Sequence, residues 1–590
     1  MLNFVLPFLR SAYQASLFCS HFRKRSTFYF IIHTAKEQHF CIIYKGFSLN
    51  RERKIPIIAF LIVFFCIFAP DMKKYLSILL IMCSPLAMSG QIRSLTDSLC
   101  YRAELQTTLS TGDNTPLWLN ANKYGLSSLQ TANGYLRGAI ERPLSVDNGR
   151  KWGIGYGADI AVAAGFTSKL VIQQAYVEGR WLKGVLTIGA KEYPMELKNQ
   201  ELSTGAQTLG INARPIPQVR LALPDYWTIP GTKNWLSLKG HIAYGKTTDD
   251  GWQKEFTGQH NKYTEGVLFH SKAGYLRIGN AEKALVSLEL GLEMANQFGG
   301  TSYRFHSDGS FDDVVHQQGG LKGMIKALIP GGSDTVDDLY TGGSGNSLGS
   351  WLARFNFDDQ DWGFSFYADH FFEDHSAMFL TEYNGYGEGA EWNVKKKRRF
   401  FLYGLKDIQV GFELRLKDAR WIDKIVTELF FSKYQSGPIY HDHDEVISDH
   451  IGGQDNYYNH GIYTGWQHWG QVIGNPLYLS PIYNTDHSIY IKNNRSKAYH
   501  IGFSGSPYPR FHYRMLGTYL KGYGTYDIPY SNPLKTVSLL AEASYAFPST
   551  SMFKGWAIKG ALGADFGKLM GNNFGMQMTI AKSGLFRQNK

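Results

Sequence analysis

Charged residues are scarce in this chain, and long apolar runs are missing from most of it. Asp, Glu, Lys and Arg make up only 19% of the 590 residues. After residue 90, no apolar stretch reaches the roughly 20 residues that a membrane-spanning helix requires. The long helical periodicity of most large soluble proteins is missing as well. These absences argue against a helical membrane protein and against a helix-rich soluble enzyme.

Cysteine is nearly absent from the main part of the chain. The five cysteines are Cys19, Cys41, Cys66, Cys83 and Cys100, so only one follows residue 91. A single thiol can form neither an internal disulfide nor a cysteine-rich metal site, and this usage suits a periplasmic route. We therefore expect no metal and no cofactor.

The net charge of +11 comes mostly from the first residues. Of the 61 Lys+Arg and 50 Asp+Glu, 11 and 3 lie within residues 1–90, so the remaining 50 and 47 nearly cancel. This distribution excludes a basic surface for nucleic acid on the main part of the chain.

The segment from Met72 has the layout of a secretion signal. Two lysines, an apolar stretch and small residues follow one another, which predicts a signal peptide over residues 72–90. A lipoprotein site at Cys83 is disfavoured because the bulky Met82 precedes it. We interpret residues 1–71 as an upstream extension from a misplaced start codon; the alternative is an N-terminal anchor.

Beyond residue 91, aromatic residues and glycine are abundant, and apolar side chains recur at every second position. Phe, Tyr and Trp make up 15% of the chain, beside 62 Gly. In three segments, 152–163, 286–294 and 408–417, the apolar positions alternate with a face that carries charged residues. The same alternation recurs in 537–547, 556–566 and 574–586. Such alternation fits strands with apolar side chains toward lipid and polar side chains toward a lumen.

Only a closed sheet lets such strands cross hydrocarbon with every backbone group paired. We predict an all-β fold, a large transmembrane antiparallel β-barrel over residues 91–586 with a tail at 587–590. Its length indicates roughly 16–20 strands, with 18 as the central value. A soluble all-β protein with one wet face is the alternative.

Three segments lack the alternation. Residues 112–128 predict a short helical or irregular plug. Residues 307–349, rich in Gly and Asp, and residues 434–495, rich in His, Tyr, Asn and Trp, predict long loops on the outer surface.

Four blocks of sequence carry a resemblance to a known family. They are TPLWLNANKYG (115–125), NARPIPQVR (212–220), ADHFFED (368–374) and GQDNYYNHGIYTGWQHWGQVIGNPL (453–477). With these blocks the chain resembles the capsule assembly Wzi family in its Bacteroides-type form. The resemblance implies a plugged outer-membrane barrel that binds capsular polysaccharide and helps to retain it on the cell.

The aromatic and polar composition of residues 434–495 suits a carbohydrate ligand. Tyr and Trp rings offer flat apolar faces to sugars, and their polar tips with Asn and His can bind hydroxyl groups. The alternative is a membrane-interface girdle or a self-packed loop. Lys395 to Arg399 could meet an acidic glycan, although a solvated turn is the favoured interpretation of that run. The glycan-binding candidates are Tyr457, Tyr458, Asn459, Tyr463, Trp466, His468 and Trp469.

Catalytic and metal motifs are weak. GNSLG places Ser347 in the pattern of a hydrolase nucleophile elbow, but a Gly-rich loop replaces the strand and helix that this motif requires. His441, Asp442, His443 and Asp444 could meet around a metal only in an irregular loop, because neighbours on a strand face opposite ways.

We therefore predict a non-enzymatic protein of the cell outer membrane that binds capsular or other surface polysaccharide in capsule assembly or attachment. Its other expected partners are outer-membrane lipid and the barrel assembly machinery. An outer-membrane channel for a small solute or saccharide is the first alternative, and an outer-membrane hydrolase is the second.

Overall fold

The chain divides into two compact units, Met1–Ser89 and Gly90–Lys590. In the first unit, β1 (Thr27–Ile32) pairs antiparallel with β2 (Phe40–Lys45). The predicted signal peptide and the tail at 587–590 lie outside the described residues. The computed structural model describes residues 27–32, 40–45, 95–96, 98–280, 284–328, 345–373, 381–382, 389–394, 401–402, 407–441, 445–446 and 451–586.

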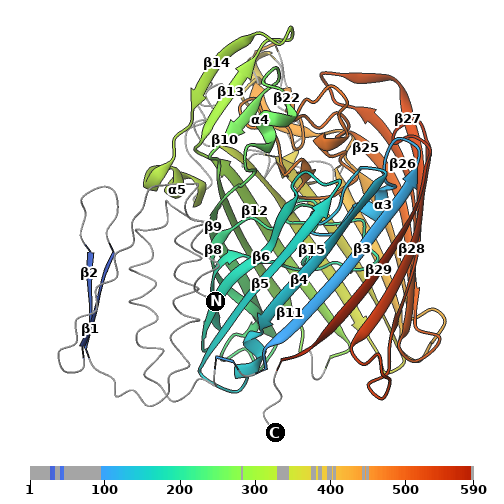
Figure 1. The fold of residues 1–590 in the computed structure, drawn as a ribbon. Helices are drawn as coiled ribbons and strands as arrows, with labels where there is room; N and C mark the ends of the chain where they lie inside the picture. The colour runs from blue at the N-terminus through green and yellow to red at the C-terminus, as the bar shows by residue number, and fades with distance from the viewer. Residues whose placement is uncertain are drawn as a thin grey trace. The chain divides into compact units, whose positions relative to one another are not determined.

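The second unit contains a closed antiparallel barrel of 18 strands, as the sequence predicts (Figure 1). The barrel closes where the last strand, β29, pairs with the first, β3. The strands are β3 (Cys100–Thr111), β4 (Ala132–Arg142), β5 (Trp152–Ala164), β6 (Leu170–Trp181), β7 (Gly184–Ala190), β8 (Gln218–Thr228), β9 (Leu236–Lys246), β11 (Leu268–Ile278), β12 (Val286–Phe298), β15 (Asn346–Asp358), β16 (Trp362–Glu373), β19 (Ile408–Leu416), β20 (Lys424–Phe431), β25 (Ser496–Gly505), β26 (Phe511–Gly524), β27 (Pro529–Ala546), β28 (Trp556–Gly567) and β29 (Asn573–Leu585).

The two faces of each strand differ as the alternation predicts. In β29, Phe574 and Met576 are exposed on the outer wall, whereas Asn573 and Gln577 are buried on the inner wall. The outer wall carries many other exposed Leu, Ile, Val and Phe side chains. An apolar outer wall around a polar interior is the arrangement that a lipid bilayer requires. No helix in the described part of the chain has the length and apolarity of a membrane span.

The connections at the two ends of the barrel differ in length. Short turns, such as 182–183 and 359–361, join the strands at one end. The long connections 191–217, 299–345 and 432–495 all leave from the other end. Barrels of this kind have short periplasmic turns and long extracellular loops, which assigns the second end to the cell exterior.

Three connections fold back into the lumen, and we call them the plug: residues 112–131, 191–217 and 455–495. The first contains α3 (Leu117–Asn120), a buried single turn that packs against β27, β28 and β29. Residues 112–128, for which the sequence predicts a plug, lie within this first segment. Leu117, Leu202 and Trp466 share one apolar cluster with inward side chains of the barrel wall. The sequence predicts a surface loop over 434–495, but most of residues 455–495 are buried in this cluster or beside it.

Other connections build a structure beyond the extracellular end of the barrel (Figure 1). Here α4 (Trp252–Phe256) lies beside a three-stranded sheet, the cap sheet, of β10 (Tyr263–Glu265), β13 (Thr301–Phe305) and β14 (Phe311–His316). A further helix, α5 (Gly320–Leu328), contacts β11 and β12. Part of the predicted loop 307–349 is therefore regular structure. The remaining short elements are η4 (Leu144–Asp147), β17 (Thr381–Glu382), η6 (Gly389–Glu391), β18 (Phe401–Leu402), β21 (Ser436–His441), β22 (Ile451–Gln454), β23 (Gln467–His468), β24 (Gln471–Val472) and η8 (Pro481–Tyr483).

Candidate functional site

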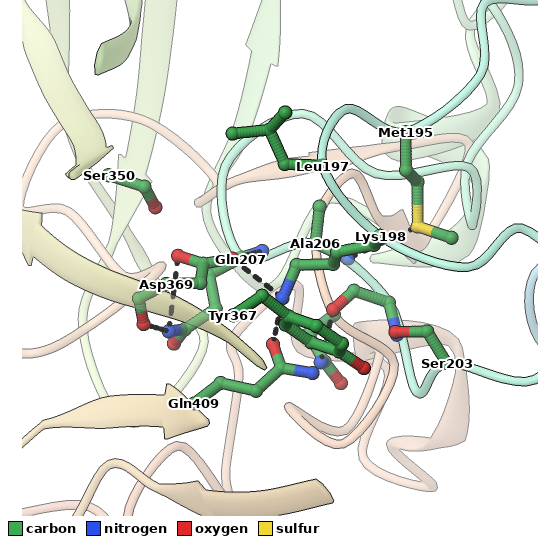
Figure 2. Close-up of polar contacts among 12 residues, drawn as sticks. Met195, Leu197, Lys198, Ser203, Ala206, Gln207, Ser350, Tyr367, Asp369 and Gln409 are labelled. Carbon is green, nitrogen blue, oxygen red and sulfur yellow. Dashed lines mark hydrogen bonds and ion pairs between the residues drawn. The ribbon is translucent and has the colours of Figure 1, made fainter. Parts of the chain in front are cut away.

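Charged side chains fix the plug to the inner wall in the extracellular half of the barrel. Lys198 of the plug forms an ion pair with Asp369 of β16 at 3.1 Å, and both side chains are 1% exposed. The same ammonium donates a 2.6 Å hydrogen bond to Oε1 of Gln409 on β19, as Figure 2 shows. Gln207 of the plug donates its backbone N–H to Asp369 at 3.1 Å. One buried cation and one buried carboxylate thus compensate each other and hold the plug at a defined depth.

A second buried carboxylate, that of Glu428 on β20, holds the next turn of the plug. It accepts hydrogen bonds from the Ser203 hydroxyl at 2.6 Å and from the Thr204 N–H and hydroxyl, both at 2.7 Å. The phenol of Tyr367 on β16 donates to the same carboxylate at 2.5 Å. A carboxylate that accepts four hydrogen bonds can stay charged in a buried place. The wall and the plug therefore share one continuous polar network.

The glycan-binding candidates Tyr457 and Tyr458 lie inside the barrel. Their side chains are 2% and 0% exposed. The Tyr457 hydroxyl donates to the Asp407 carboxylate at 3.3 Å, and the Tyr458 hydroxyl donates to the carbonyl of Gln207. Burial raises the pKa of both phenols well above the usual value. Both groups are therefore neutral hydrogen-bond donors to other parts of the protein.

Asn459, Tyr463 and Trp466 are buried in the same way. Asn459 exchanges two hydrogen bonds with the backbone of Ile491, at 2.8 and 3.0 Å. The Tyr463 hydroxyl donates to the Gly299 carbonyl at 3.3 Å. The Trp466 indole donates to the Thr208 carbonyl at 3.0 Å, and its ring stacks on Phe269 of β11 with centroids 5.7 Å apart.

His468 ends β23, and Trp469 lies in the tight turn between β23 and β24. Burial lowers the pKa of His468 to about 4, so its ring is neutral. Its Nδ1 lies 2.9 Å from the Arg214 carbonyl, and its Nε2 accepts the Thr248 N–H at 3.1 Å. Trp469 is half-buried, with the Arg214 guanidinium 4.2 Å from its ring centroid.

The structure thus brings all seven candidates together, but within the plug. Six of them are buried, and their polar tips bind protein groups. Only Trp469 keeps part of its ring open. Their role in glycan binding stays a prediction, whereas their contacts are those of residues that hold the plug in the lumen.

Gly474, in the VIGNPL part of the late block, shows how closely the plug packs. A Cβ at this position would collide with the Tyr458 hydroxyl and with the carbonyl oxygen of Gln207. Any larger residue would push the late segment of the plug away from residues 191–217. The requirement for Gly here is therefore a requirement of packing between two plug segments.

The inner wall toward the periplasmic end has a different character. Ion pairs line it, among them Arg102 with Asp159 at 3.0 Å and Arg277 with Glu289 at 2.6 Å. The arginine side chains are 39% and 30% exposed. Charge is therefore accessible to water in this half of the lumen, in contrast to the level of Lys198.

The cap sheet presents aromatic side chains outside the barrel. Tyr303 stacks on Tyr263 with centroids 4.6 Å apart, and Phe305 meets Phe311 edge to face at 5.8 Å. Phe311 is 57% exposed, and Tyr303 and Phe305 are half-buried. The opposite face of the sheet is fixed to the plug, because the Ser302 hydroxyl donates to the Ile462 carbonyl at 2.7 Å.

The sequence analysis missed these cap residues. Residues 301–305 fall outside the alternating segments and the loops that the sequence predicts, and residues 311–316 fall within a predicted loop. The alternation of Thr301, Tyr303 and Phe305 with Ser302 and Arg304 is the signal that could have revealed them.

The weaker motifs show no catalytic or metal-binding geometry where the structure describes them. Ser347 lies within strand β15 and accepts a hydrogen bond from Asn296 of β12, so it is not at a strand-to-helix turn. Among the described residues, no three His, Cys, Asp or Glu side chains form a group suited to a metal. The run Lys395 to Arg399 and residues 442–444 lie outside the described residues.

The sequence matches no family model and no curated protein. Solved barrels are similar in architecture. Wzi of Escherichia coli, a carbohydrate-binding barrel involved in group 1 capsule assembly, shares 13% identity at a TM-score of 0.46, over 81% of this chain and 83% of Wzi. Pseudomonas aeruginosa OprD shares 9% sequence identity at a TM-score of 0.39, and the match covers 83% of this chain and 96% of OprD. Acinetobacter baumannii OccAB4 shares 9% sequence identity at a TM-score of 0.38, and the match covers 84% of this chain and 100% of OccAB4. Such low values establish no family for this chain.

The membrane assignment rests on the molecule itself. Eighteen paired strands leave no open edge, and the outer wall is apolar around a charged interior. Closed barrels of this type belong to outer membranes. The chain is an outer-membrane β-barrel.

Proposed function

We propose that this barrel binds a surface polysaccharide at its extracellular end and retains it on the cell, as in capsule assembly or attachment. The observation that carries the proposal is the plug. Residues 112–131, 191–217 and 455–495 fill the lumen beneath the cap and bond to its wall, so the cap remains as the surface that meets the exterior.

The cap sheet has the chemistry that a sugar polymer requires. The rings of Tyr303 and Phe311 offer apolar faces to sugar C–H groups. Arg304 and His306, both about half-exposed, lie beside Asp312 and supply hydrogen-bonding groups at the same place.

The test is binding of polysaccharide purified from the producing cells to the purified barrel. We expect the Tyr303→Ala/Phe311→Ala variant to bind roughly 30-fold more weakly, since each of the two rings is worth about 1 kcal/mol. Phe574→Ala, which removes an exposed ring from the lipid-facing wall, is the matched control and should bind normally. Equal binding by wild type and the double variant would reject the cap sheet as the site.

A cellular test addresses retention. Deletion of the gene should leave polymer synthesis intact and release polymer into the medium. Polymer that stays on the deletion strain at the normal level would contradict an attachment role.

A channel is the second candidate function, because exposed charges such as Arg102 and Arg277 line the periplasmic half of the lumen. A water-filled path would have to pass the plug. Stepwise ion conductance by the wild-type protein would favour this candidate over polysaccharide binding.

A further inference from the structure

Three lysines lie side by side on the outer wall near the extracellular end. In the antiparallel register, Lys497 of β25 is directly opposite Lys521 of β26, and Lys521 is directly opposite Lys535 of β27. All three alternate with buried inward residues, such as Ala498 and Leu520, so they point away from the lumen. We call Lys497, Lys521 and Lys535 the lysine row.

Like charges directly opposite each other on neighbouring strands repel, which makes this arrangement unfavourable without a counter-charge. In the described part of the chain, no carboxylate forms an ion pair with any of the three ammonium groups. Two of them lie over aromatic rings: the Lys497 ammonium is 4.6 Å from the centroid of Phe431, and the Lys521 ammonium is 5.4 Å from that of Tyr523. Ring faces attract a cation but do not neutralise it.

More cations surround the row. Lys433 lies 4.9 Å from the Tyr523 centroid, and the Arg495 guanidinium lies 3.8 Å from that of Tyr526. Exposed Lys568 directly follows β28, where Leu569 donates its N–H to the Lys535 carbonyl at 3.4 Å. Cations are therefore concentrated at the extracellular ends of β25, β26 and β27, which lie side by side in the barrel wall (Figure 1).

The residues next to the row give its depth in the membrane. Two positions further toward the periplasm, the next outward row in this register contains Tyr499, Tyr519, Val537 and Phe566, and its three aromatic side chains are exposed. The following row contains exposed Ile501 and Leu539. Aromatic girdles mark the membrane interface and aliphatic rows mark the hydrocarbon. The lysine row thus lies at the level of the lipid headgroups of the outer leaflet.

We propose that the lysine row binds the phosphate groups of a phosphorylated lipid of the outer leaflet. The continuity of the row with the lipid-facing wall selects a lipid over a soluble partner. A phosphate supplies the missing counter-charge and accepts several charge-assisted hydrogen bonds at once. The lipid would lie against β25, β26 and β27, and its binding would not depend on a ligand at the cap sheet.

The experiment measures binding of diphosphoryl lipid A to the purified full-length barrel in detergent by native mass spectrometry. The test variant is Lys497→Gln/Lys521→Gln/Lys535→Gln. The matched control is Lys183→Gln/Lys233→Gln/Lys554→Gln, which removes three exposed lysines from the short turns at the opposite end. The folding of each variant is checked on a detergent gel, where a folded barrel that has not been boiled migrates differently from the boiled, unfolded chain.

We expect the test variant to bind lipid A on the order of 100-fold more weakly, from about fivefold for each lysine near an anionic surface. The control should bind like wild type, and dephosphorylated lipid A should bind wild type as weakly as lipid A binds the test variant. An excess of inorganic phosphate should compete poorly, because it lacks the acyl chains that contact the wall.

Equal lipid A binding by the folded test and control variants would overturn the proposal. So would loss of binding to an acidic polysaccharide in the test variant with unchanged binding of lipid A. Full competition by inorganic phosphate would also overturn it, since the site would then recognise a free anion and not a lipid.

Discussion

The two halves of the lumen both contain ion pairs, yet the pairs lie in opposite surroundings. In the extracellular half, Lys198 and Asp369 are each 1% exposed and belong to a network that fixes the plug. In the periplasmic half, Arg277 is 30% exposed and its partner Glu289 is 8% exposed. The two ion pairs therefore contribute differently to the stability of the fold, because water screens the Arg277 pair and is excluded from the Lys198 pair.

This difference teaches how one barrel can be closed and still have a charged interior. Charges in the dry half are fixed by several partners, as Glu428 is by Ser203, Thr204 and Tyr367. Partly exposed pairs in the periplasmic half, such as Arg277 with Glu289, can be changed at lower cost. The same kind of substitution should therefore lower the free energy of unfolding by different amounts in the two halves.

The largest effect is expected for Lys198→Met. The substitution leaves Asp369 charged, buried and without its cation, which costs about 3–5 kcal/mol of the free energy of unfolding. Urea unfolding in lipid vesicles measures this loss. Lys198→Met/Asp369→Asn removes both charges and should recover part of it. A loss below about 1 kcal/mol for Lys198→Met would show that water reaches this level of the lumen.

A smaller effect is expected for Gly474→Ala. The added methyl group collides with backbone and with the Tyr458 hydroxyl, and overpacking of this kind costs about 1–3 kcal/mol. Thermal unfolding in detergent should show a lower Tm. Gly560→Ala on β28, where a Cβ meets nothing within 4 Å, is the control. Equal Tm values for the two variants would mean that the plug segments do not pack as described.

The smallest effect is expected for Arg277→Met in the periplasmic half. Its ion pair with Glu289 is partly exposed, so its loss should cost about 1 kcal/mol or less. The urea titration used for Lys198→Met measures it under the same conditions. A cost as large as that of Lys198→Met would remove the distinction between the two halves.

The barrel could be predicted from the sequence because its signal is local. Alternation within a single strand, as in residues 574–581, reveals which side chains face lipid, and the polar inner face follows from it. Residues 112–128 also differ locally from a strand, since their apolar residues do not recur at every second position. These features need no knowledge of distant residues.

The interior position of residues 455–495 could not be predicted in this way. Tyr458 and Trp466 have the same composition and spacing whether their rings face a sugar or the inner wall. Their partners Gln207 and Thr208 lie about 250 positions away in sequence. The lysine row was hidden for a related reason, because Lys497, Lys521 and Lys535 become neighbours only when the strand register is known.

Ion conductance of the purified barrel in a planar bilayer tests the closed extracellular half most directly. The plugged lumen predicts no stable conductance steps for the wild-type protein. Replacement of all three plug segments, residues 112–131, 191–217 and 455–495, by short Gly/Ser linkers should produce them, because barrels of this strand number leave an aqueous channel when nothing fills them. Stable, large conductance steps in the wild-type protein would contradict the account.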